Sequence, residues 1–210
     1  QFALLQIKPM VMGGSREIIN IEEESDNEIL CSSKVTLGDG LINDVRHIVF
    51  VNPKKFKPAI TKDIAKEIHA INQTLINKHP YILVGPGRWG SADPWLGVPV
   101  NWEQINGASA IVELGKKYFP VDPSFGSHFF QNVTSMRLGY FTIDHNSNTD
   151  IFDFNWLNKQ IIKEDKTFTT CFKLEQPLRI KIDGTTGNGV ILKPKIPMLE
   201  PMNEQETSGI

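Results

Sequence analysis

The residues best suited to bind a ligand lie in a glycine-rich loop that follows an apolar run of strand length, residues 81–84. The candidate anion-binding residues of this loop are Gly85, Gly87, Arg88, Gly90 and Ser91. Ser91, Asp93 and Pro94 together predict the start of a helix. A strand that breaks into glycines before a helix can present main-chain N–H groups to an anion, and Arg88 adds a planar cation beside them.

A structural alternative explains the same loop without a ligand. In that alternative the loop is a tight packed turn, with Trp89 in the core and Arg88 paired to a carboxylate. The string is neither a Walker loop nor the dinucleotide fingerprint, because no Gly-Lys-Ser/Thr follows the glycines and no clear βαβ unit surrounds them. Asp93 would also compete with an anion for amides at a helix start.

His128 is a further candidate contact for an anion. Ser127 is a suitable N-cap, and apolar residues at helical spacing follow it up to Gly139. The helix dipole would keep an imidazole in the first turn neutral, so His128 could accept or donate a hydrogen bond. The same position is equally compatible with a purely structural histidine.

The composition excludes several classes of function. With 22 basic and 24 acidic residues the chain has a net charge of −2, so we expect no nucleic-acid partner. No apolar run reaches the length of a membrane span, and we expect no membrane partner. The two cysteines, Cys31 and Cys171, have no metal-ligand spacing and favour a reducing, cytoplasmic environment. Asp39 and Asp44 lie in turn sequence, so no metal site is predicted.

The pattern of the chain predicts an α/β fold, with a mixed β-sheet, flanking helices and antiparallel strands at the C-terminal end. The alternative is α+β. The predicted helices are 61–78, one from 127 and a short one within 153–162; the predicted strands are 29–37, 46–51, 81–84, 108–114, 140–143 and several from 167. Residues 11–192 are expected to form one domain, with a possible small β-unit from 167, and 193–210 a loose tail.

Residues 2–8 also alternate as a strand does, which places Gln6 and Lys8 on one face. An amide and an ammonium side by side could hold a phosphate oxygen and a neighbouring polar group. A solvated edge strand would show the same spacing.

The string Phe2 to Met10, FALLQIKPM, resembles the closing strand of the ATP-grasp module in phosphoenolpyruvate synthases and pyruvate phosphate dikinases. By this resemblance residues 1–10 are the last strand of an upstream ATP-grasp module in a longer chain. Gln6 and Lys8 would then bind nucleotide, with ATP and Mg as cofactors of the parent protein. The family has Arg where this chain has Lys8, so one ammonium replaces a bidentate phosphate contact.

Two longer strings, GPGRWGSADPWLGVPV at 85–100 and GSHFFQNVTSMRLGYFTI at 126–143, are similar to a region that follows ATP-grasp in phosphoenolpyruvate synthase-like proteins. The first string also echoes a phosphohistidine loop, but it contains no histidine to carry a phosphoryl group.

Two functions remain open. The chain is either the C-terminal region of an ATP-dependent phosphotransferase, or a non-catalytic scaffold or small-anion module that packs on the ATP-grasp core. No catalytic residue is assigned, and the piece alone is expected to be inactive.

Overall fold

In a computed structural model that describes residues 25–115, 138–144 and 146–194, ten strands pair into one mixed sheet. Its strands are β1 (Ile29–Ser33), β2 (Val35–Leu37), β3 (Gly40–Val51), β4 (Tyr81–Pro86), β7 (Ala108–Leu114), β8 (Gly139–Ile143), β9 (Ile151–Phe152), β10 (Ile161–Asp165), β11 (Thr169–Asp183) and β12 (Asn188–Leu192). A separate two-stranded pair consists of β5 (Arg88–Trp89) and β6 (Gly97–Val98). The helices are α1 (Thr61–Leu75) and α3 (Phe154–Leu157), with 3-10 turns at Asp26–Glu28, Pro58–Ile60 and Trp102–Gln104.

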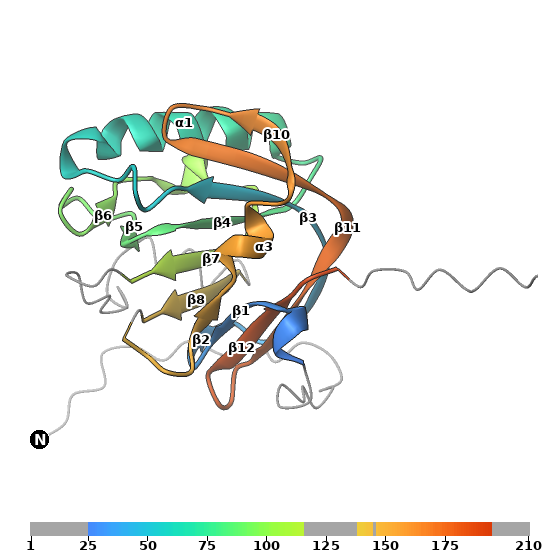
Figure 1. The fold of residues 1–210 in the computed structure, drawn as a ribbon. Coiled ribbons are helices and arrows are strands. Elements are labelled where there is room, and N and C mark those ends of the chain that lie inside the picture. The colour runs from blue at the N-terminus through green and yellow to red at the C-terminus, as the bar shows by residue number, and fades with distance from the viewer. Residues whose placement is uncertain (1–24, 116–137, 145, 195–210) are drawn as a thin grey trace, which may run out of the picture.

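The centre of the sheet is parallel and its two flanks are antiparallel. Strands β3, β4, β7 and β8 lie side by side in chain order, all parallel (Figure 1). The antiparallel strand β2 pairs with β8, while β11, β12, β1 and β9 extend the sheet beyond β3. The mixed sheet with antiparallel C-terminal strands is therefore confirmed, and the fold contains more strand than helix among the described residues.

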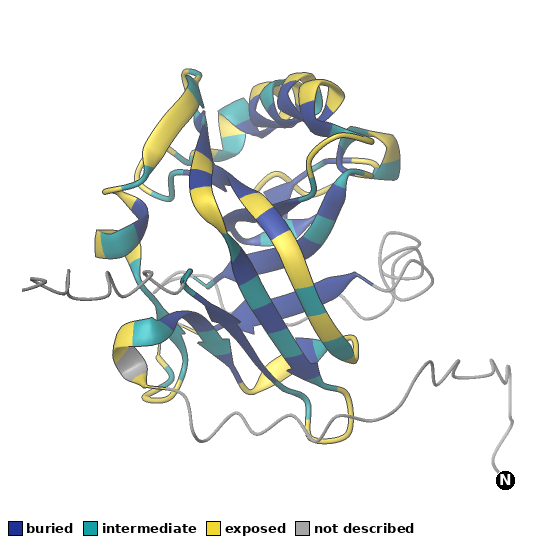
Figure 2. Ribbon diagram, turned by 90° about the vertical axis from the view of Figure 1, so that its right-hand side faces the viewer, coloured by how far each residue is buried: buried dark blue, intermediate teal, exposed yellow. Residues whose placement is uncertain are grey.

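Helix α1 covers one face of the parallel strands. Its buried apolar residues Ile64, Ile68, Ile71 and Leu75 recur at helical spacing and share one core with residues of β3, β4 and β7. In Figure 2 this helix carries both buried and exposed positions, whereas the central strands are mostly buried. The predicted helix is confirmed, but it ends at Leu75 because Ile76 has extended backbone angles, φ −53° and ψ 138°.

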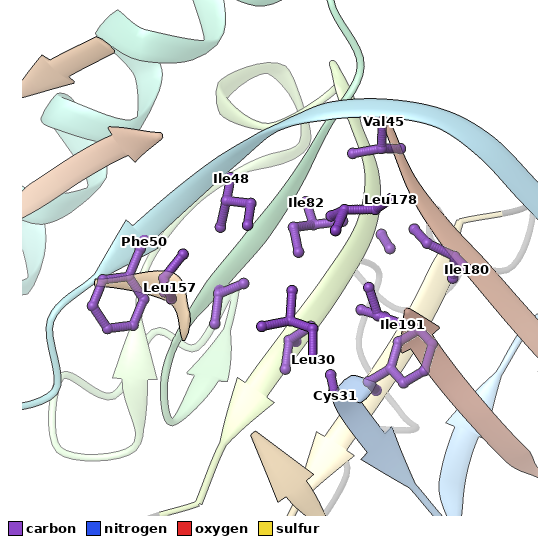
Figure 3. Close-up of a cluster of buried hydrophobic side chains, with 14 of the residues drawn as sticks. Leu30, Cys31, Val45, Ile48, Phe50, Ile82, Leu157, Leu178, Ile180 and Ile191 are labelled. Atoms are coloured by element: carbon purple, nitrogen blue, oxygen red, sulfur yellow. The ribbon is translucent and has the colours of Figure 1, made fainter. Parts of the chain in front are cut away.

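Among the described residues, the opposite face of the sheet is covered mainly by the sheet itself, which closes on itself. A second core gathers side chains from β1, β3, β4, β11 and β12, together with Leu157 of α3 (Figure 3). Two hydrogen bonds join the ends of the rolled sheet: Ser33 Oγ donates to Thr142 O at 2.5 Å, and Thr36 N donates to Gly187 O at 2.9 Å. The sheet thus resembles a barrel around this core.

Close approach of β12 to β2 and β8 requires a glycine. A Cβ at Gly189 would lie 2.8 Å from Phe141 Cε1 and 2.9 Å from Thr36 Cγ2, so a side chain there would push the closing strands apart.

Several sequence predictions need correction. The strand 29–37 is split at Lys34 into β1 and β2. The helix within 153–162 is shorter, because Asp153 caps only the four residues of α3 and the chain becomes β10 at Ile161. Strands from residue 169 belong to the main sheet, since β11 pairs with β3 along most of its length.

The residues before 25, after 194 and between 116 and 137 lie outside the described residues, and with them the predicted strand 2–8, the helix from 127 and most of the tail. Within the described ranges, no helix has the length and apolar character needed to cross a membrane.

Asn72 of α1 joins the helix to β4 and to the turn before β7. Its Oδ1 accepts hydrogen bonds from Tyr81 Oη at 2.8 Å and Gly107 N at 3.0 Å, and its Nδ2 donates to Asn106 Oδ1 at 2.9 Å. Asn72 is fully buried, so no water molecule could replace its side chain as the hydrogen-bond partner of Tyr81 Oη and Gly107 N.

We predict that Asn72→Ala lowers the free energy of unfolding by about 2 to 4 kcal/mol, because it leaves a buried hydroxyl and a buried amide unpaired. Urea unfolding followed by far-ultraviolet circular dichroism measures this change. The exposed Gln73→Ala on the same helix is the matched control. Equal effects of the two substitutions would contradict the structural role of Asn72.

Candidate functional site

The glycine-rich loop leaves the sheet at the carboxyl end of β4, where parallel α/β sheets commonly bind ligands. Trp89 folds back beneath this end of the strand and is 1% exposed. A Cβ at Gly85 would lie 2.8 Å from Trp89 Cζ2 and 3.0 Å from Val51 Cβ. Gly85 is therefore required by the packing of the indole, as the structural alternative for this loop proposed.

The other glycines let two backbone segments touch. Strands β5 and β6 pair in register through Arg88 and Gly97, and a Cβ at Gly97 would lie 1.8 Å from Arg88 O. Gly87 has a φ of 72°, and a Cβ there would lie 2.5 Å from Leu96 O. Bare backbone at these positions faces neighbouring backbone and leaves no space for a ligand.

The main-chain amides of the loop donate to protein oxygens. Gly87 N donates to Leu114 O at 3.1 Å, Arg88 N to Leu96 O at 2.9 Å and Gly90 N to Val98 O at 2.9 Å. The prediction that these amides form a cradle for an anion is therefore wrong, because each is already used to fix the loop.

The predicted helix start after the loop is also wrong. Ser91 Oγ accepts from Asp93 N at 3.2 Å and donates to Asp93 O at 3.1 Å, and Asp93 Oδ1 accepts from Trp95 N at 2.9 Å. These bonds build a turn. The Trp95 side chain is 63% exposed on it.

A buried carboxyl group lies directly behind the loop. Glu113, near the carboxyl end of β7, has no exposed surface, and its Oε1 accepts a hydrogen bond from Trp89 N at 3.0 Å. Trp89 Nε1 also donates to Val112 O, at 3.4 Å. Glu113 Oε2 is buried and has no hydrogen-bond partner within the part of the chain that the structure describes.

Burial raises the pKa of Glu113 into the neutral range. Desolvation raises its pKa from 4.5 to about 7, although hydrogen bonds from Tyr140 and from Trp89 N, and the charge of Arg88, act in the opposite direction. Tyr140 is 2% exposed, and its pKa is raised well above 10, first by burial and then by the Glu113 carboxyl. A carboxyl with a pKa near 7 can take up or release a proton at physiological pH.

Arg88 lies close enough to act electrostatically on both Glu113 and Tyr140. Its half-buried side chain nevertheless makes no ion pair or hydrogen bond with any described residue. The structural alternative of an Arg88–carboxylate pair is thus not seen within residues 25–115, 138–144 and 146–194. The guanidinium is a cation beside a carboxyl that is half neutral at pH 7.

The structure brings only part of the predicted site together. Gly85, Gly87, Arg88, Gly90 and Ser91 lie in one loop, whereas Gln6, Lys8 and His128 lie outside the described residues. Sequence reasoning missed Glu113 and Tyr140, which stand within strand segments otherwise rich in apolar residues. The signal that could have indicated this site was the single carboxylate, Glu113, in the otherwise apolar strand β7, which is buried on both faces.

Residues suited to bind a metal do not gather in the described ranges, where no group of three His, Cys, Asp or Glu side chains could hold an ion. Asp39 Oδ1 instead accepts from Gly184 N at 3.0 Å, a contact between turns.

Comparison with family models, with curated proteins and with solved structures gave no match for this chain.

We predict that Glu113 makes stability depend on pH. Its pKa is higher in the folded than in the unfolded chain, so folding binds a proton between about pH 4.5 and about 7. Stability should fall as pH rises through this range, by about 3 kcal/mol in total. Glu113→Gln, which keeps the bond from Trp89 N, should abolish this contribution.

The measurement is the difference in urea unfolding free energy between Glu113→Gln and the parent chain at a series of pH values. Exposed Glu103→Gln is the control and should follow the parent chain. A constant difference between pH 5 and pH 8 would show that Glu113 does not titrate as described.

Proposed function

We propose that this chain is the C-terminal binding region of a phosphoenolpyruvate synthase-like, ATP-dependent phosphotransferase. In this proposal it is not catalytic by itself. It holds a small anion, such as a carboxylate or phosphate group, with the Arg88 side chain at the carboxyl end of β4.

The observation that carries this proposal is the charge of Arg88, whose side chain makes no ion pair or hydrogen bond with a described residue. Burial dominates the pKa of Glu113, and Arg88 contributes the least of the groups that lower it. Because the pKa of the neighbouring carboxyl is raised to about 7, this group neutralises the guanidinium only in part at pH 7. An anionic ligand could then accept a charge-assisted, bidentate contact from Arg88.

The loop gives this side chain a rigid support. The amides of Gly87, Arg88 and Gly90 are bound to protein carbonyls, and Trp89 anchors the segment in the core. A guanidinium carried by a fixed backbone loses little conformational entropy when it binds, which favours recognition of a small ion.

Assignment to a phosphotransferase rests on the resemblance of residues 2–10, 85–100 and 126–143 to the phosphoenolpyruvate synthase-like proteins. ATP and Mg would belong to the upstream ATP-grasp module, with Gln6 and Lys8 completing the nucleotide site. The buried free thiols of Cys31 and Cys171 are compatible with a cytoplasmic location.

A non-catalytic scaffold is the second candidate. The hydrogen bonds that the loop amides donate to protein carbonyls favour the scaffold, because amides used in this way cannot also bind an anion. In this case Arg88 would be an ordinary surface residue and would bind no ligand.

Substitution of Arg88 distinguishes the anion-binding region from the scaffold. Calorimetric titration with phosphoenolpyruvate, pyruvate and inorganic phosphate should reveal binding of at least one of them. Arg88→Gln should weaken that binding by roughly tenfold or more, because a charge-assisted bidentate contact is lost.

The exposed Lys159→Gln removes the same charge elsewhere and should leave the affinity unchanged. Thermal unfolding of both variants checks that they remain folded. Unchanged affinity of Arg88→Gln for every ligand would reject the anion site and favour the scaffold.

We predict further that the purified 210-residue chain does not turn over ATP. Among the described residues, no group of three or more His, Cys, Asp or Glu side chains could hold a metal ion. Coupled-enzyme detection of ADP tests this, with an active phosphotransferase as positive control. Sustained ADP release by the purified chain would contradict the assignment of a non-catalytic region.

A further inference from the structure

A second cluster of titratable groups lies at the opposite end of β4 from the glycine loop. His47 of β3 is the register partner of Tyr81, the first residue of β4, and His79 lies two residues before that strand. The two imidazole rings stack with centroids 5.0 Å apart and planes tilted by 35°. The pair therefore lies where the parallel pairing of β3 with β4 begins, with His47 within β3 and His79 just before β4.

The histidine pair combines a buried ring with an exposed one. His47 is 3% exposed, and its Nδ1 is buried without a hydrogen-bond partner in the described part of the chain. His79 is exposed. Because the Nδ1 of His47 is closed off from solvent, the exposed ring of His79 is the member of the pair that can contact a ligand directly.

Two lysines add positive charge from the other side of β3. Lys173 of β11 is the register partner of His47, and Lys163 lies on β10, which pairs with β11. Both are exposed, and both act electrostatically on His47. Neither makes an ion pair with a described residue.

Two of the acidic groups near these lysines are engaged elsewhere. Glu164 pairs with Lys166 at 2.7 Å, and Asp165 Oδ1 accepts from Thr170 Oγ1 at 2.7 Å. Glu175, two residues beyond Lys173 on β11, is exposed and makes no ion pair with a described residue. Neither lysine is therefore neutralised by an ion pair within the described ranges.

The pKa of His47 reflects the positive charge of this cluster. Its pKa is lowered from 6.5 to about 4, first by burial and then by Lys163, His79 and Lys173. No carboxylate contributes to the shift. Tyr81, the register partner of His47 on β4, adds an uncharged group.

We propose that His47, His79, Lys163 and Lys173 form a binding site for a phosphate-type oxyanion. Two ammonium groups can donate to different oxygens of a tetrahedral anion, and an imidazole N–H can donate to a third. A metal cation is a poor fit, since two lysines would repel it. This site is independent of Arg88, which lies on β5, just beyond the carboxyl end of β4.

Residue-specific NMR on the folded chain tests the proposal. Titration with inorganic phosphate at pH 7 should shift the ring signals of His47 and His79. A bound anion should also raise the pKa of His47, by on the order of 1 pH unit, because negative charge stabilises the imidazolium form.

The double substitution Lys163→Ala with Lys173→Ala should weaken phosphate binding at least tenfold. Lys62→Ala with Lys66→Ala removes the same charge from the exposed face of α1 and should leave binding unchanged. Arg88→Gln should also retain this binding, which separates the two sites experimentally.

Two results would overturn the proposal. One is the absence of shifts in His47 and His79 at millimolar phosphate when the chain is folded. The other is an equal phosphate affinity in the two double-lysine variants, which would indicate non-specific attraction by net charge.

Discussion

Burial of strand β4 on both faces is the constraint on which the rest of this structure depends. Tyr81 and Leu83 point into the core beneath helix α1, whereas Ile82 and Val84 point into the core of the rolled sheet. A strand of this kind needs a cover on each side. The helix supplies one cover, and the antiparallel flanks, which curl back until β12 meets β8, supply the other.

The same two-sided burial determines the chemistry at both ends of the strand. At the carboxyl end desolvation raises the pKa of Glu113 to about 7, and at the amino end it lowers the pKa of His47 to about 4. Both shifts favour the neutral form, because a low-dielectric surrounding disfavours charge of either sign. Arg88 therefore lies near a carboxyl that is only partly ionised at neutral pH, and Lys163 and Lys173 lie near an uncharged imidazole.

The glycine loop shows how one composition can serve two purposes. Glycines that could admit a ligand instead admit the indole of Trp89 and the backbone of Leu96 and Gly97. The loop consequently acts as a rigid support for one side chain, Arg88, rather than as a row of main-chain donors. Anion recognition at this end of the sheet must come from side chains.

The sequence alone determined the elements whose signal is local. The spacing of Ile64, Ile68 and Leu75 predicted α1, and the apolar runs 81–84 and 108–114 predicted β4 and β7, because periodicity reflects one buried face of each segment. Only the tertiary structure decided that Gly87 N binds Leu114 O and that Glu113 is buried beside Trp89 and Tyr140. These partners are far apart in the chain. A short pattern indicates which groups could bind, but only the folded neighbours decide which of them are already occupied.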